Sequence, residues 1–111
     1  MAWKWYDVTS YRASVGSPGY YGGVQLMGDG LYAILTFHRE GPLPDASVTT
    51  LFRDRFHGHM DFQQMPIVVD LLRNEEPLRF GWNEEDVNSY KLQTGAELVG
   101  EGEDPLDEDE T

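Results

Sequence analysis

The chain of 111 residues contains no cysteine, so a disulfide framework, a thiolate metal site and a cysteine nucleophile are all excluded. Long apolar runs are missing too: runs such as residues 67–69 and 71–72 are far short of the ~20 residues that a membrane-spanning helix needs. The N-terminal residues lack the apolar stretch of a signal peptide. We therefore expect a cytoplasmic protein that is stable on packing alone, without a membrane or a cofactor.

Basic residues are scarce, because eight Lys and Arg face 20 Asp and Glu and leave a net charge of −12. Residues 100–111 hold seven of the acids and no base, so residues 1–99 carry a net charge of only −5. We expect a single domain over residues 1–100 and an acidic, flexible tail over residues 101–111. Direct binding to nucleic acid is disfavoured, because phosphate affinity needs a concentrated basic surface.

The first half of the chain has the alternating pattern of β-strands. Trp3 and Trp5 fall on one face of a strand near the N-terminus. The residues Gly28-Asp29-Gly30 predict a hairpin between strands at 22–27 and 31–38. Both faces of the second strand are largely apolar, which predicts a central position. Residues 41–45 predict a loop, and residues 46–60 predict one bent strand or two short ones, with a break near Asp54.

A short helix is predicted from Pro66 to about residue 75, because Pro suits the first helical turn and Pro77 ends the pattern. Its expected apolar stripe consists of four residues, Ile67, Val68, Leu71 and Leu72. Glu75 and Glu76 oppose the helix dipole at the C-terminal end, at a cost of roughly 0.3–1 kcal/mol each. This unfavourable placement of two Glu residues at the C-terminal end of the helix is either compensated by Arg79 or functional.

A strand at 78–82, a polar loop at 83–89 and a short strand from Tyr90 to Leu92 are predicted after the helix. A last short pairing is predicted at Leu98 and Val99. The chain therefore predicts an α+β fold: a mostly antiparallel sheet of five to seven strands, with one short helix, about residues 66–75, packed on one face.

Two segments of the last third carry a resemblance. Residues 71–77 read LLRNEEP and residues 94–103 read TGAELVGEGE. They resemble small bacterial proteins of unknown function that have an LLRNEKP-like helix exit and a C-terminal TGxEPVGEGE-like segment. Glu76 stands where that pattern commonly has Lys, and Leu98 where it commonly has Pro. The resemblance implies a sheet with one helix and carries no activity with it.

The best metal candidate is the segment from His57 to Asp61. On a strand, His57, His59 and Asp61 point to one face and lie roughly 6–7 Å apart, so that they could surround one cation. His38 could add a fourth ligand if its strand is adjacent. The alternative is the exposed polar face of an edge strand, and the alternation with apolar residues favours this alternative over a metal site.

The same face is a weaker candidate for single-stranded nucleic acid, because aromatic and basic side chains together suit stacked bases and phosphates. The residues in question are Arg53, Arg55, His57, His59, Tyr20 and Tyr21. Asp54 and Asp61 interrupt this set, which argues against such a role.

Partner binding is the function that the sequence favours. The aromatic residues exceed the needs of one thin core, and Tyr and Trp are common interface anchors. The interface candidates are Trp3, Trp5, Tyr20, Tyr21 and Trp82. We expect a non-enzymatic protein–protein interaction module or a homodimer; acidic inhibitors or regulators encoded by phages and mobile elements are one analogous class. The alternative is a metal-binding protein or metal-dependent enzyme that uses His57, His59 and Asp61.

Overall fold

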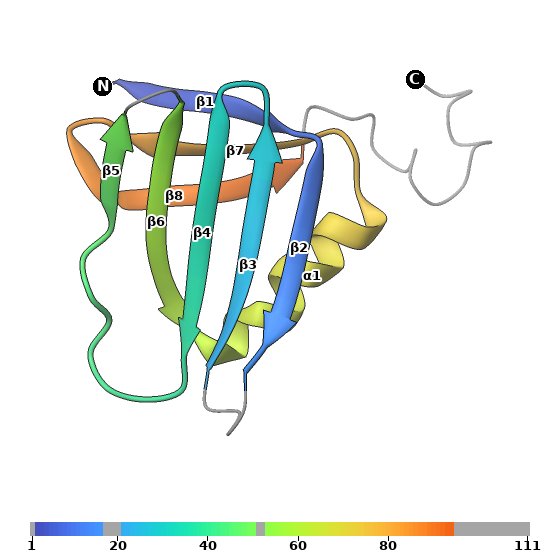
Figure 1. Ribbon diagram of the computed structural model, residues 1–111, viewed down its shortest axis with the longest axis vertical. Helices are drawn as coiled ribbons and strands as arrows, with labels where there is room; N and C mark the ends of the chain where they lie inside the picture. The colour runs from blue at the N-terminus through green and yellow to red at the C-terminus, as the bar shows by residue number, and fades with distance from the viewer. Residues whose placement is uncertain (1, 17–20, 51–52, 95–111) are drawn as a thin grey trace, which may run out of the picture.

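The computed structural model describes residues 2–16, 21–50 and 53–94, which form two sheets and one helix (Figure 1). One sheet has three strands in the order β1-β7-β8, namely β1 (Trp3–Val8), β7 (Leu78–Asn83) and β8 (Asp86–Thr94). The other has five strands in the order β2-β3-β4-β6-β5, namely β2 (Ser10–Val15), β3 (Tyr21–Gly28), β4 (Leu31–His38), β5 (Ser47–Thr50) and β6 (Asp54–Asp61). All pairings are antiparallel except β4 with β6. The predicted α+β class is confirmed, with eight strands in the described part of the chain rather than five to seven.

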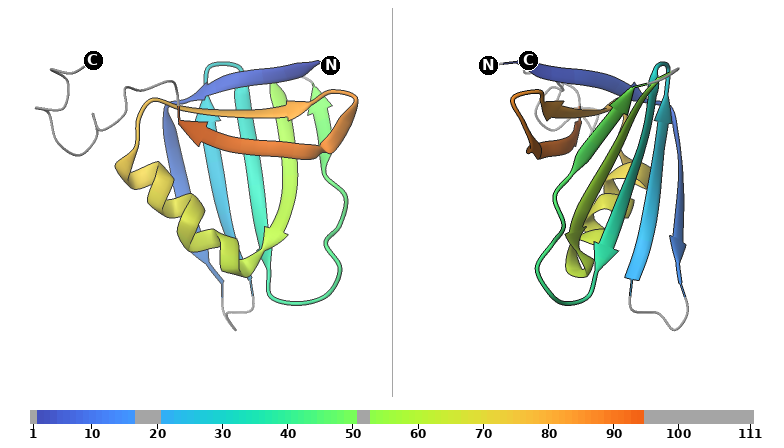
Figure 2. Two further views of the ribbon diagram at one scale, coloured as in Figure 1. Left: turned by 180° about the vertical axis from the view of Figure 1, so that it is seen from behind. Right: turned by 60° about the vertical axis from the view of Figure 1, so that its left-hand side comes forward.

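The three-stranded sheet lies across one face of the five-stranded sheet, and helix α1 (Met65–Asn74) lies beside it on the same face (Figure 2). No element of the described chain covers the opposite face. The chain passes from one sheet to the other at Thr9, between β1 and β2. Here the backbone crosses so close to Gly28 that a Cβ atom on Gly28 would collide with the carbonyl oxygen of Asp7. Gly28 thus permits the bend that joins the two sheets.

The core lies between these two layers. β4 contributes four fully buried side chains to it, from Leu31, Ala33, Leu35 and Phe37. The hairpin predicted at residues 28–30 and the central position of β4 are confirmed. The other face of β4 is half-buried among its neighbours rather than covered by a second layer.

Helix α1 begins at Met65, one residue before the predicted start, and follows a 3-10 turn over Phe62–Gln64. It buries Met65, Val68 and Leu72, whereas Ile67 is 58% exposed. The predicted stripe was wrong at Ile67, because the helix packs through residues three and seven positions beyond Met65. Within the described ranges, no helix is long and apolar enough to cross a membrane.

Two further expectations differ from the structure. Residues 83–89 were expected as a loop, but β8 already begins at Asp86 and pairs with β7 after a short turn. Residues 10–15 form β2, a strand that the sequence pattern did not indicate. Between residues 46 and 60 the sequence predicted one bent strand or two short ones; the structure has two strands there, the short β5 and the eight-residue β6, which begins at Asp54 near the predicted break. The expected tail and the pairing at Leu98 and Val99 lie outside the described residues.

Candidate functional site

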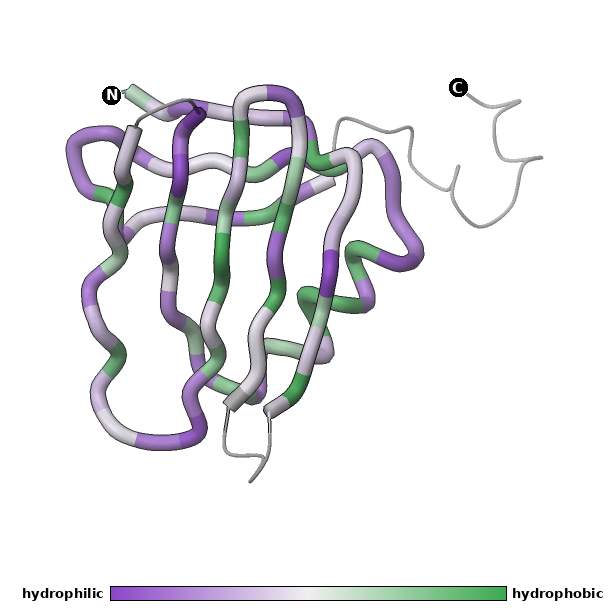
Figure 3. The backbone as a smooth tube through the Cα atoms, in the orientation of Figure 1, coloured by the Kyte–Doolittle hydropathy of each residue, from purple (hydrophilic) through white to green (hydrophobic). Residues whose placement is uncertain are grey.

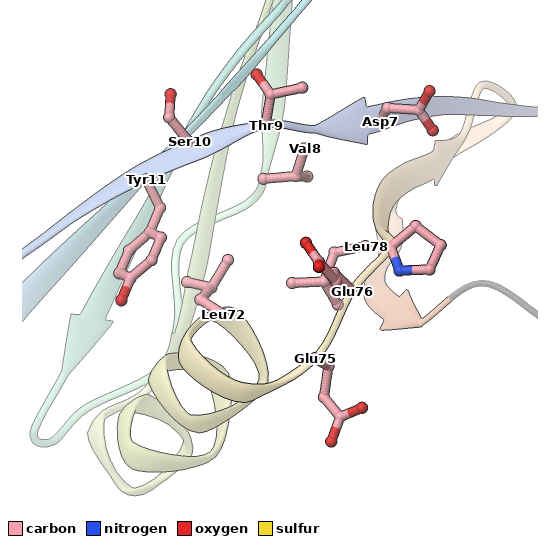
Figure 4. Close-up of a pocket in the computed structure, with 10 residues that line it drawn as sticks. Asp7, Val8, Thr9, Ser10, Tyr11, Leu72, Glu75, Glu76 and Leu78 are labelled. Atoms are coloured by element: carbon pink, nitrogen blue, oxygen red, sulfur yellow. The ribbon is translucent and has the colours of Figure 1, made fainter. Parts of the chain in front are cut away.

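A cleft of about 680 Å³ opens where the strand bend faces the end of α1 (Figure 4). One wall is the bend itself, residues 7–11, and the other is the C-terminal end of α1 with the segment that leads into β7. Tyr11 and Leu72 point into the space between these walls. The cleft therefore lies where the chain changes sheets at Thr9.

The lining of the cleft combines an apolar floor with an acidic rim. The floor consists of Val8, Tyr11, Leu72 and Leu78, and the rim of the exposed Asp7, Glu75 and Glu76. Glu75 and Glu76 lie beyond the last turn of α1, where the Glu75 backbone N–H still donates to the Leu71 carbonyl (3.0 Å). Among the described residues that line the cleft, none is basic. The site thus suits an apolar group that carries a positive charge.

The cleft adjoins an open strand edge. β2 is the last strand of the five-stranded sheet, and no described strand pairs with its outer side. Its side chains are almost all exposed, and Val15 at its end is 62% exposed. The outer backbone groups of such a strand can pair with a further strand from another chain.

The predicted histidines lie on the uncovered face of the five-stranded sheet. His57 and His59 both point outward from β6, and their rings stack with centroids 4.8 Å apart. His38 lies on the neighbouring strand, as the metal hypothesis required, and its Nε2 atom lies 2.9 Å from His59 Nδ1. His57 Nε2 lies 3.3 Å from the hydroxyl of Thr36. The structure therefore brings three imidazoles together, two from β6 and one from β4.

The Asp61 side chain is not part of this group of imidazoles. Its carboxylate accepts from the Gln63 backbone N–H (3.2 Å) and caps the 3-10 turn. Burial lowers the pKa of His59, and the nearby His57 and His38 lower it further. Among the described residues, no three His, Asp or Glu side chains are grouped so that they could hold a metal ion.

The predicted interface tryptophans separate into two environments. Trp3 and Trp5 stack on the outer face of the three-stranded sheet, with ring centroids 5.3 Å apart. Arg79 lies over the Trp5 ring and Lys91 over the Trp3 ring, each 5.0 Å from the centroid. Trp5 also covers Gly81, where any side chain would collide with its ring. This surface combines indoles with cations, in contrast to the acidic cleft.

Trp82 lies on the inner face of the same sheet and is only 2% exposed, so the structure places it in the core instead of at an interface. Its ring stacks on Phe56 and on Tyr6, with centroid distances of 5.0 and 5.5 Å. Tyr20 and the side chain of Tyr21 lie outside the described part of the structure.

A buried carboxylate ties the two sheets together. Asp54, 6% exposed, accepts hydrogen bonds from the Tyr6 hydroxyl and from Thr50 Oγ1 (2.8 Å), and Lys4 Nζ lies 2.8 Å away. Burial raises the pKa of Asp54, but these three partners outweigh it and hold the pKa below its usual value. The hydrogen bond to Asp54 raises the pKa of Lys4 to about 12. Because the Asp54 carboxylate is satisfied by Tyr6, Thr50 and Lys4, we regard the cluster as structural.

The sequence did not predict the cleft. One sequence signal does point to its rim: Glu75 and Glu76 oppose the helix dipole, which is unfavourable unless these residues are compensated or functional. The opposite wall could not be found from sequence, because it forms only when residues 7–11 bend between sheets. No protein-family model matches the chain, and no curated protein or solved structure matches it either. The resemblance to small bacterial proteins therefore stays a prediction.

Proposed function

We propose that the chain is a non-enzymatic protein-binding module that holds an extended segment of a partner along β2 and in the adjoining cleft. One observation carries this proposal: a cleft of about 680 Å³ with an apolar floor lies next to the outer edge of β2, with which no described strand pairs. A partner segment in extended form gains main-chain hydrogen bonds from the edge and places alternate side chains on the inner face. The cleft supplies the pocket that such an arrangement needs for specificity.

Charge defines the kind of segment. An apolar side chain packs on Tyr11 and Leu72, and a neighbouring Lys or Arg comes close to Glu76, which lies beside the opening, with Asp7 and Glu75 farther out on the rim. Exposed charges contribute more to the choice of partner and to the association rate than to raw affinity. The partner segment is therefore basic and apolar in alternation, and an acidic segment of the same shape is rejected.

The test uses two synthetic peptides of about seven residues, a common strand length, one alternating Lys with Val and the other Glu with Val. Each is titrated into the ¹⁵N-labelled full chain and followed by NMR. We expect the Lys peptide to shift amide signals of β2 and of the end of α1, and to bind at least ~10-fold more tightly than the Glu peptide, a difference of ~1.4 kcal/mol. Equal affinity for both peptides would contradict the proposed role of the rim.

A matched pair of variants separates the cleft from general charge. Glu75→Lys with Glu76→Lys reverses the rim, and Glu84→Lys with Glu85→Lys makes the same change in the exposed turn between β7 and β8. The first variant is expected to weaken the Lys peptide ~10-fold or more, and the second to leave its affinity within about twofold, because exposed charges beyond a Debye length are screened. If both variants weaken binding alike, the peptide recognises net charge and not this cleft.

A further inference from the structure

The outward face of the five-stranded sheet differs in charge from the rest of the protein. The outward face consists of the side chains that alternate with the buried ones along β2 to β6. Arg12, Arg55, His38, His57 and His59 lie on it, and Asp61, at its end, is the one acid among its described residues. On a chain of net charge −12, the face is therefore depleted of acids.

The bases of β6 form a regular row. Arg55, His57 and His59 alternate with buried residues, so neighbours in the row are about 6.6–6.8 Å apart along the strand. The Arg55 guanidinium lies over the Tyr32 ring, 5.3 Å from its centroid. A groove of about 230 Å³ runs beside Arg55 and His57, between β4 and β5. Figure 3 shows this hydrophilic strand beside the more hydrophobic β4.

We propose that the acidic residues 101–110 of this same chain dock in extended form on the outward face, along the row of bases on β6. Four of their seven acids are at positions that an extended chain would place on one side, namely Glu101, Glu103, Asp107 and Asp109. Glu101 and Glu103 are two positions apart, as are Asp107 and Asp109. Extended carboxylates two residues apart have the same spacing as the bases of β6.

The chain after Thr94 is long enough to bring the acidic residues from the end of β8 to β6 on the outward face. β8 ends at Thr94, which pairs with Leu78, and Leu78 in turn pairs with Val8 at the corner where β1 leads into β2. This corner is at the edge of the five-stranded sheet. The thirteen residues from there to Asp107 span up to ~43 Å when extended, against a layer separation of ~10 Å. The tail can therefore pass around the edge strand and reach β6.

The test compares the full chain with a variant of equal length whose tail is neutral. In that variant Gln replaces Glu101, Glu103, Glu108 and Glu110, and Asn replaces Asp104, Asp107 and Asp109. We expect NMR signals of outward-facing residues on β4 and β6 to differ between the two proteins. Raising NaCl from about 25 mM to about 300 mM should move the native signals towards those of the variant, because salt screens exposed charges. Coincident spectra of β4 and β6 in both proteins would overturn the proposal.

Two controls make the result specific. Glu84→Gln with Glu85→Gln, which removes exposed acids from the turn after β7, should leave the β4 and β6 signals in place. Introducing Arg55→Gln should reduce the effect of neutralising the tail by at least about half, because Arg55 is the member of the row whose charge is permanent. Differences that disappear on dilution would show that the tail binds a second copy, which overturns docking within one chain. This surface is separate from the cleft, so either proposal can fail without the other.

Discussion

At the scale of single residues, Asp54 is the position where a small change should have a large effect on stability. Replacing it with Asn keeps the shape but removes the charge that Lys4 faces and weakens the hydrogen bonds from Tyr6 and Thr50. We expect Asp54→Asn to lower the free energy of unfolding by about 2 kcal/mol, since removing one member of a buried polar cluster is costly. Urea unfolding at pH 7 measures this. Asp7→Asn, an exposed carboxylate, should change stability by less than about 0.5 kcal/mol.

His59 should make the protein sensitive to mild acid. Its pKa is lowered in the folded state by burial and by His57 and His38, so the unfolded chain takes up a proton first as the pH falls. The stability that the neutral imidazole contributes is complete above its usual pKa of 6.5 and is lost as the pH falls through 6.5 towards the folded value. Urea midpoints between pH 7.5 and about 5 should decline more for the native chain than for His59→Gln. Parallel curves would show that His59 does not carry this dependence.

At the scale of elements, α1 offers a matched test of which face packs. The sequence pattern placed Ile67 and Leu72 in one apolar stripe, yet Ile67 is 58% exposed and Leu72 is 9% exposed. Leu72→Ala should cost about 2–4 kcal/mol, because it removes buried methylene groups and leaves a cavity. Ile67→Ala should cost less than about 0.5 kcal/mol. Comparable losses in urea unfolding would mean that α1 is rotated about its axis from the orientation seen here.

The elements that sequence could predict are those whose signals are local. The hairpin at Gly28–Gly30 has its turn residues in place, and Pro66 and Pro77 mark the ends of α1 closely. β2 was missed because an edge strand with both faces largely exposed has no alternation to detect. The parallel pairing of β4 with β6 could not be expected either, because β5 intervenes in the chain and then pairs at the outer edge. Pairings between distant segments depend on the whole sheet, not on any window of sequence.

At the scale of the whole molecule, one of the two surfaces of interest, the outward face with its histidines, could be predicted from sequence, and the cleft could not. Alternation along β6 placed His57 and His59 on one outward face, and the structure agrees, with His38 as their neighbour. Asp61 does not lie with these histidines as a ligand would, because its carboxylate caps the 3-10 turn that follows β6. The cleft arises where residues 7–11 meet the end of α1, segments about 65 residues apart, and that meeting is set by global topology.

The sequence suggested a homodimer because it has more aromatic residues than one thin core was expected to need. The core between the two sheets of one subunit in fact uses five rings that contact one another, from Tyr6, Phe56, Phe80, Trp82 and Tyr90, and Trp82 is the one interface candidate among them. Trp3 and Trp5 remain on an outer surface, but Arg79 and Lys91 lie over them. A symmetric dimer through this surface would bring these cations together, and like charges across an interface disfavour association.

We therefore expect the native chain to remain a monomer of 12.6 kDa by sedimentation at low salt and neutral pH. Arg79→Gln with Lys91→Gln removes the repulsion and exposes the indole faces, so this variant should associate more readily than the native chain, by ~10-fold or more in dimerisation constant. Arg73→Gln, an exposed change on α1, is the control and should leave the mass unchanged. A native dimer whose affinity rises on adding salt would instead show that the tryptophan surface pairs with itself despite its cations, because screening would then relieve the repulsion between copies.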